Sequence, residues 1–170
     1  MMKRLTAAAV AATLTFFSTT APAQAGEPYW QCVTFARMFS GIQIFGDAWT
    51  WWESATGKYE KGSTPRTGAV LVFRPTGRMT RGHVAVVSAM LSDQVVQITH
   101  ANWGGSRGRV EENVTLVDVS PKGDWSQVRV WHAPSGNLGV TVYPTYGFIY
   151  QTARDMGRAA SQIAAGTGQD

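Results

Sequence analysis

The spacing of apolar residues changes along this chain, and the change predicts helices first and strands after them. Residues 31–39 place apolar side chains every three to four positions, which is typical of one face of a short helix. A second helix is expected over residues 48–56, because Asp47 is a good N-cap residue and Gly57 can end the helix in the left-handed conformation.

From Gly68 onward the apolar runs are short and rich in β-branched residues, as expected for strands separated by turns. The predicted strands cover residues 69–73, 83–91, 95–102, 110–119, 127–131 and 147–150. Helices that precede a run of antiparallel strands indicate an α+β domain rather than a parallel βαβ array.

The first 25 residues have the three parts of a secretory signal peptide. Lys3 and Arg4 form a basic n-region, residues 5–17 form an apolar run, and Ala23-Gln24-Ala25 has the small-x-small pattern that signal peptidase recognises. The apolar run is too short for a membrane anchor, since a spanning helix needs about 20 apolar residues. We therefore expect cleavage after Ala25, no stable membrane insertion after cleavage, and a secreted or periplasmic protein.

The predicted mature chain forms one domain over residues 26–150, followed by a tail at 151–170 that is flexible or weakly helical. The full chain has a net charge of +4, which falls by two when Lys3 and Arg4 are removed. So weak a charge gives no reason to expect a nucleic-acid partner, although a mildly basic surface suits a polyanionic cell envelope. The sequence has no metal-ligand spacing and no phosphate-binding glycine loop, and we expect a monomer.

The chain has a single cysteine, Cys32, and therefore no internal disulfide. Cys32 is expected in the first turn of the first helix, where free backbone N–H groups and the helix dipole favour an anion. This position predicts a lowered thiol pKa and donors for the oxyanion of a tetrahedral intermediate. The alternative is a buried cysteine that acts as a small hydrophobic side chain.

A thiol nucleophile needs a base, and the chain has three histidines. His83 begins a predicted strand after a glycine, and His100 ends the next strand. An even-length turn at Ser92-Asp93 would place His83 opposite Asn102, with His100 on the same face of the sheet. These three side chains would then converge beside a cleft, whereas His132 is interpreted as structural.

Three segments resemble the signature blocks of the CHAP family, the cysteine, histidine-dependent amidohydrolases and peptidases. They are Trp30-Gln31-Cys32-Val33-Thr34-Phe35-Ala36-Arg37, Gly82-His83-Val84-Ala85-Val86-Val87 and Ile98-Thr99-His100-Ala101-Asn102-Trp103. The resemblance implies a papain-like α+β single domain, related to the NlpC/P60 peptidases, with N-terminal helices packed on an antiparallel β-sheet. It also implies a peptidoglycan substrate and no metal or organic cofactor.

Carried over by position, the resemblance makes Cys32 the nucleophile and His83 the general base. It assigns Gln31 to the neighbourhood of the oxyanion and Trp103 to substrate binding. The family commonly has an acid where this chain has His100, but a histidine as third member recurs in the NlpC/P60 peptidases. Either His100 or Asn102 is therefore expected to orient His83.

The sequence thus predicts an exported cysteine hydrolase that forms an acyl-enzyme on Cys32. Its reaction would be that of an N-acetylmuramoyl-L-alanine amidase or an endopeptidase of peptidoglycan. Two alternatives stay open. One is a catalytically weak or inactive wall-binding module, and the other is an amidase of a small peptide-like conjugate, because the block around Cys32 also resembles glutathionylspermidine amidase domains.

Overall fold

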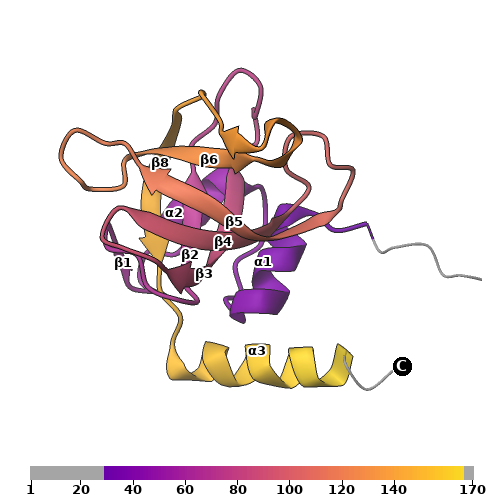
Figure 1. The fold of residues 1–170 in the computed structure, drawn as a ribbon. Helices are drawn as coiled ribbons and strands as arrows, with labels where there is room; N and C mark the ends of the chain where they lie inside the picture. The colour runs from indigo at the N-terminus through magenta and orange to yellow at the C-terminus, as the bar shows by residue number, and fades with distance from the viewer. Residues whose placement is uncertain (1–28, 167–170) are drawn as a thin grey trace, which may run out of the picture.

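The computed structural model describes residues 29–166, and most of its elements are strands (Figure 1). The predicted signal peptide, its cleavage site after Ala25 and the last residues of the predicted tail lie outside this range. In chain order the elements are α1 (Cys32–Ser40), the 3-10 turn η1 (Ala48–Thr50), α2 (Trp51–Ser54), β1 (Lys61–Gly62), β2 (Val70–Phe73), β3 (His83–Met90), β4 (Val95–Ala101), β5 (Val110–Asp118), β6 (Gln127–His132), the 3-10 turn η2 (Ala133–Ser135), β7 (Asn137–Leu138), β8 (Tyr143–Ile149) and α3 (Ala153–Gly166).

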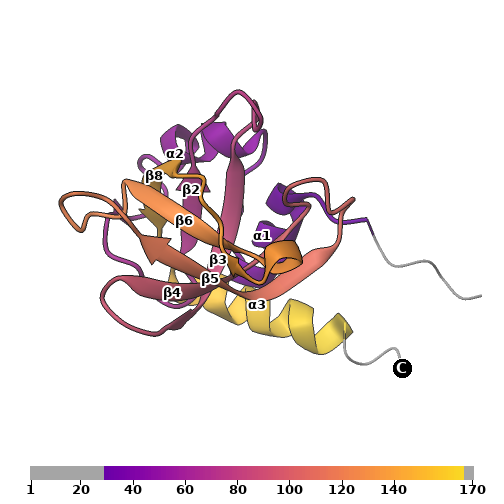
Figure 2. The ribbon, with the colours of Figure 1, turned by 45° about the horizontal axis from the view of Figure 1, so that its top comes forward.

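The strands form one antiparallel sheet in the order β1-β8-β2-β3-β4-β5-β6-β7, and β8 also pairs with β6 (Figure 2). The start of β8 pairs with β6, where Tyr143 is opposite Val128. The rest of β8 pairs with β2, where Ile149 is opposite Val70. Strand β8 therefore pairs with strands from both ends of the run β2-β3-β4-β5-β6, and these six strands close into a barrel.

The predicted papain-like helix-on-sheet fold is therefore wrong, because the molecule is a closed, mostly β barrel with three short helices. The physical reason is the length of β8, which the sequence pattern limited to residues 147–150. Pro144 cannot donate to a sheet, and Gly147 has φ +127° beside a β-bulge in the pairing with β2, so neither looks like the interior of a strand. Both nevertheless belong to the strand that closes the barrel.

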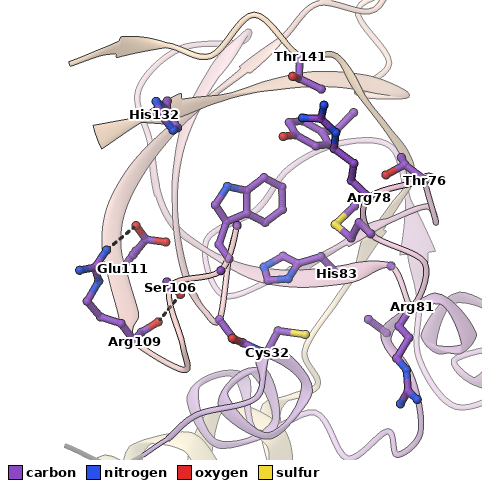
Figure 3. Close-up of a pocket in the computed structure, with 18 of the residues that line it drawn as sticks. Cys32, Thr76, Arg78, Arg81, His83, Ser106, Arg109, Glu111, His132 and Thr141 are labelled. Carbon is purple, nitrogen blue, oxygen red and sulfur yellow. Dashed lines mark hydrogen bonds and ion pairs between the residues drawn. The ribbon is translucent and has the colours of Figure 1, made fainter. Parts of the chain in front are cut away.

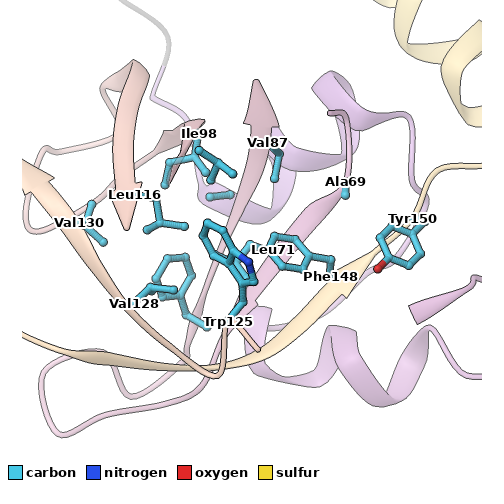
Figure 4. Packing of buried hydrophobic residues seen from close by; sticks show 13 residues of the cluster. Ala69, Leu71, Val87, Ile98, Leu116, Trp125, Val128, Val130, Phe148 and Tyr150 are labelled. Carbon is cyan, nitrogen blue, oxygen red and sulfur yellow. The ribbon is translucent and has the colours of Figure 1, made fainter. Parts of the chain in front are cut away.

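Alternate residues of β2 and β3 pack into two separate hydrophobic clusters, one on each face of these strands. Leu71, Ala85 and Val87 point into the barrel, where they pack with Trp125 and with Phe148 of the neighbouring strand β8 (Figure 4). Val70, Val72, Val84 and Val86 point outward and pack against α1, α2 and the segment between them. These two strands are therefore buried on both faces, which fixes the position of α1 against the start of β3.

The segment predicted as a flexible or weakly helical tail contains α3, which lies across α1. Arg158 of α3 donates a hydrogen bond to the carbonyl of Gly41, directly after α1, and pairs with Asp155 at 2.9 Å. Within residues 29–166 no helix is both long and apolar enough to cross a membrane.

Candidate active site

Cys32 is the first residue of α1, and Gln31 is its N-cap residue. The Cys32 side chain is half-buried and packs against the cluster that covers the outer face of β3. Its thiol is within hydrogen-bonding reach of the backbone of Val84, the residue directly after His83. Figure 3 shows the Cys32 side chain next to the ring of His83, at the bottom of a cleft.

The electrostatic balance at Cys32 differs from the prediction made from its place in the helix. Burial raises the pKa of the thiol above its ordinary value of 9.0, while hydrogen bonds to the backbone of Val84 and Val33 lower it by less. The predicted lowering of this pKa by the helix start is therefore wrong, because desolvation of the thiolate outweighs the backbone donors. The resting form of Cys32 is a neutral thiol.

His83 and His100 form a buried pair at the mouth of the barrel. Nε2 of His83 lies 3.0 Å from Nδ1 of His100, and the rings are almost perpendicular, at 84°. Burial lowers the pKa of His83 well below 6.5, with a further contribution from His100, and burial lowers the pKa of His100 to about 4. Both rings are therefore neutral at neutral pH, and the contact with His100 engages Nε2 of His83 rather than its second ring nitrogen, Nδ1.

The hairpin of β3 and β4, which carries the two histidines, has the predicted register near the site but not the predicted turn. Three residues, Ser92–Gln94, separate the paired Leu91 and Val95, so the prediction of an even-length turn at Ser92-Asp93 is wrong. A β-bulge at Ser88 inserts one extra residue into β3 and restores the register closer to the site, where Val86 is opposite Thr99. The two changes of parity cancel, so the two histidine side chains still meet.

Asn102 lines the site, and its side-chain hydrogen bonds go to residues other than His83. Its Oδ1 accepts a hydrogen bond from the backbone N–H of Gly108 at 3.0 Å, and its Nδ2 donates to Oε1 of Gln31 at 3.1 Å. A backbone N–H can only donate, so the atom of Asn102 that faces Gly108 must be the amide oxygen. The Asn102 NH₂ group then faces Gln31, and the Gln31 atom that accepts from it must be Oε1. The remaining amide group of Gln31, Nε2, is thus a donor on the residue that precedes Cys32.

Trp103 closes the barrel mouth above the histidines. Its ring centroid is 4.8 Å from that of His83 and 5.3 Å from that of His100, and it also makes a tilted contact with Phe73 and an edge contact with Tyr143. Each of these rings excludes water from the histidine pair. Trp103 therefore contributes to the desolvation that keeps both imidazoles neutral, in addition to lining the cleft.

A cleft of about 1300 Å³ contains all the predicted site residues except the fully buried His100. It extends past Arg78 and Arg81 on one side and Arg109 on the other (Figure 3). His132 also lines it, but its Nδ1 is 2.7 Å from Oγ of Ser135 in the neighbouring turn.

Two further residues that line this cleft were not predicted from the sequence. Glu111 lies opposite His100 in the ladder between β4 and β5, although nothing in its sequence context distinguishes it from Glu112. Arg78 belongs to a loop between two strands and has no ion-pair partner among residues 29–166. A basic residue in a polar loop is too common for the sequence to have marked it.

In a comparison with known families, the chain matches the family model described as CHAP domain over residues 23–102. This stretch holds Gln31, Cys32, His83, His100 and Asn102, and the resemblance found in the sequence is thereby confirmed. Members of this family are generally hydrolases of the cysteine, histidine-dependent amidohydrolase type. Trp103 and Glu111 come after the matched stretch.

Proposed function

With a CHAP domain identified at residues 23–102, we propose that this chain is an exported cysteine hydrolase of the amide bonds of peptidoglycan. One observation carries the proposal. The barrel mouth holds a buried, neutral His83 beside Cys32, with one ring nitrogen engaged by His100. An imidazole held in this way has a single nitrogen left for proton transfer, as a general base requires.

In the proposed reaction, Nδ1 of His83 removes the proton from the Cys32 thiol while the sulfur attacks an amide carbonyl carbon. The carbonyl π electrons move to oxygen and form a tetrahedral oxyanion. When this collapses, the carbon–nitrogen bond breaks, and protonated His83 gives its proton to the departing amine. The resulting thioester is then attacked by water, which loses a proton to His83, and Cys32 is released as a thiol.

The oxyanion has two candidate donors at the start of α1. The backbone N–H of Cys32 lies in the first turn, where N–H groups have no carbonyl partner inside the helix. The Nε2 group of Gln31 is the second donor, since Asn102 engages the other end of the same amide. A side chain held in this way needs little reorganisation when charge develops on the oxygen.

The charge around the cleft favours a substrate that carries carboxylates, as peptidoglycan stem peptides do. Arg81 is already paired with Asp47 at 3.3 Å, and Arg109 with Glu111 at 3.7 Å. Arg78 has no such partner within residues 29–166 and lines the same cleft. We propose Arg78 as the cation that meets a substrate carboxylate.

One observation favours the alternative of a weak or inactive wall-binding module. The raised pKa of Cys32 means that little thiolate exists at rest, so attack depends on proton transfer to His83 in the reaction itself. The two functions differ in the rate at which iodoacetamide alkylates Cys32 at neutral pH. A thiol without a working base should react more slowly than a free cysteine of ordinary pKa.

The function is tested by digesting purified peptidoglycan with the mature protein and identifying the fragments by mass spectrometry. Intact stem peptides with a free N-terminus, released from whole glycan strands, would identify an amidase. Shortened stems or opened cross-bridges would identify an endopeptidase. Cys32→Ala is the control, and a digest identical to that of Cys32→Ala would overturn the proposal.

A further inference from the structure

Glu111 and His100 each have a buried side-chain atom without a hydrogen-bond partner among the described residues, and these two atoms face each other. They are Nε2 of His100 and Oε2 of Glu111, which are 3.6 Å apart. The other oxygen of Glu111 is 3.7 Å from the guanidinium of Arg109, which is exposed. A buried donor and a buried acceptor left facing each other need an explanation, because each costs free energy while unpaired.

A second β-bulge brings Glu111 to this place. Ile98 pairs with Val114, but His100, two residues along β4, pairs with Glu111, three residues along β5. The extra residue is absorbed around Asn113, whose φ is +52°. Simple alternation from Val114 would have turned Glu112 toward the barrel, yet Glu112 is exposed and Glu111 is the residue that faces His100.

We infer that Glu111 is a positioning residue that fixes the proton arrangement of both histidines by accepting a hydrogen bond from Nε2–H of His100. This inference rests on the proposed roles of Cys32 and His83. With its proton on Nε2, His100 has a bare Nδ1, which accepts the hydrogen of Nε2–H of His83 across their 3.0 Å contact. The proton of His83 is then on Nε2, and Nδ1 keeps a lone pair for the Cys32 thiol.

The opposite arrangement would disable the base. A proton on Nδ1 of His100 would point at Nε2 of His83, and the His83 proton would move to Nδ1, the nitrogen that must accept from Cys32. A neutral His100 does not choose between the two tautomers by itself. Its Nε2 has no hydrogen-bond partner among the described residues, and Oε2 of Glu111 lies 3.6 Å from it. The Glu111 carboxylate also stabilises the positive charge that His83 acquires during proton transfer.

The direct test is nuclear magnetic resonance of the mature protein labelled with ¹⁵N in its histidine rings. We expect His83 and His100 both to carry their proton on Nε2 at neutral pH. A proton on Nδ1 of either ring in the wild-type protein would overturn the inference. This readout needs neither a substrate nor a variant, so it remains decisive even if the proposed wall hydrolysis fails.

The matched variants are Glu111→Gln and Glu112→Gln, which remove the same charge from adjacent residues, one facing His100 and one exposed. Glu111→Gln offers an amide that can donate to Nε2 of His100, so we expect a changed or mixed tautomer population. We also expect alkylation of Cys32 by iodoacetamide to slow by roughly tenfold or more, as loss of a correctly protonated base does. Glu112→Gln should leave both unchanged. Equal rates and equal spectra for the two variants would show that Glu111 does not set the tautomer.

Discussion

The hydrogen-bond partner of His83 is His100 and not Asn102, although both were candidates to orient it. The 3.0 Å contact joins the two imidazoles, whereas both ends of the Asn102 amide are used by Gly108 and Gln31. In the proposed mechanism the two residues would therefore support different parts of the chemistry. His100 would act on the base, and Asn102 would act through its hydrogen bond to Gln31, the residue before Cys32.

This division predicts different effects for His100→Ala and Asn102→Ala. Alkylation of Cys32 by iodoacetamide needs a proton acceptor but no oxyanion donor, so His100→Ala should slow both alkylation and hydrolysis. Asn102→Ala should slow hydrolysis by roughly 10²-fold, as loss of an oxyanion donor does, and leave alkylation nearly unchanged. Quenched time courses of iodoacetamide labelling measure the alkylation rate, and digests of purified peptidoglycan measure the hydrolysis rate. Slow alkylation in Asn102→Ala with a normal rate in His100→Ala would reverse the two assignments.

Cys32→Ala should abolish hydrolysis with little loss of stability. Removing a catalytic nucleophile lowers kcat by factors on the order of 10⁶. The side chain is half-buried at a cleft wall, so the free energy of unfolding should fall by no more than about 1 kcal/mol. Turbidity of a wall suspension measures the activity, and urea unfolding measures the stability. Wall degradation by the folded variant would exclude the thiol mechanism.

The two buried histidines predict a loss of stability in mild acid. Both have folded-state pKa values below the ordinary 6.5, that of His100 at about 4, so the unfolded chain binds protons more readily than the folded one. The contribution of the neutral histidines to the free energy of unfolding should therefore be fully present above about pH 6.5. It should be lost as the pH decreases toward 4, by roughly 3 kcal/mol for His100. Urea unfolding across this range measures it, and His100→Gln should flatten the pH dependence.

Arg78→Gln should raise KM for stem peptides that carry carboxylates and change kcat little, since Arg78 lines the cleft away from the reacting thiol. A single charge-assisted contact corresponds to roughly a tenfold change in KM. Stem peptides with amidated carboxyl groups provide the comparison, and the variant should lose its defect with them. An equal defect on both substrates would mean that Arg78 does not bind a carboxylate.

The sequence predicted which residues lie together at the cleft better than it predicted the fold around them. The blocks around Cys32, His83 and His100 identified a CHAP domain, because nucleophile and base types at this spacing are specific in combination. The barrel was missed because its closure depends on Pro144 and Gly147, two residues that argue against a strand interior. The raised pKa of Cys32 was missed because desolvation depends on packing that no local pattern contains.

Two β-bulges account for the other differences. The extra residue at Ser88 offsets an odd-length turn, so the predicted convergence of His83 and His100 held although its stated reason failed. The extra residue near Asn113 turns Glu111 rather than Glu112 toward His100. A bulge changes the face of every later residue in its strand, and one sequence alone does not show where it occurs.

Gly108 links the loop after β4 to the segment before Cys32, and its replacement by alanine should lower activity through that link. The φ of Gly108 is +82°, its N–H donates to Asn102, and its carbonyl accepts from the N–H of Trp30 at 3.1 Å. A Cβ atom there would lie 2.9 Å from the backbone nitrogen of Trp30, so the chain leading to Cys32 would have to move. Gly105→Ala is the matched control, since Gly105 in the same loop has φ +85° and nothing within 4 Å of an added Cβ. Both variants should lose about 1 kcal/mol of stability from the positive φ, but only Gly108→Ala should also lose most of its hydrolytic rate, measured on folded protein. Equal activity in the two variants would show that this contact does not position the nucleophile.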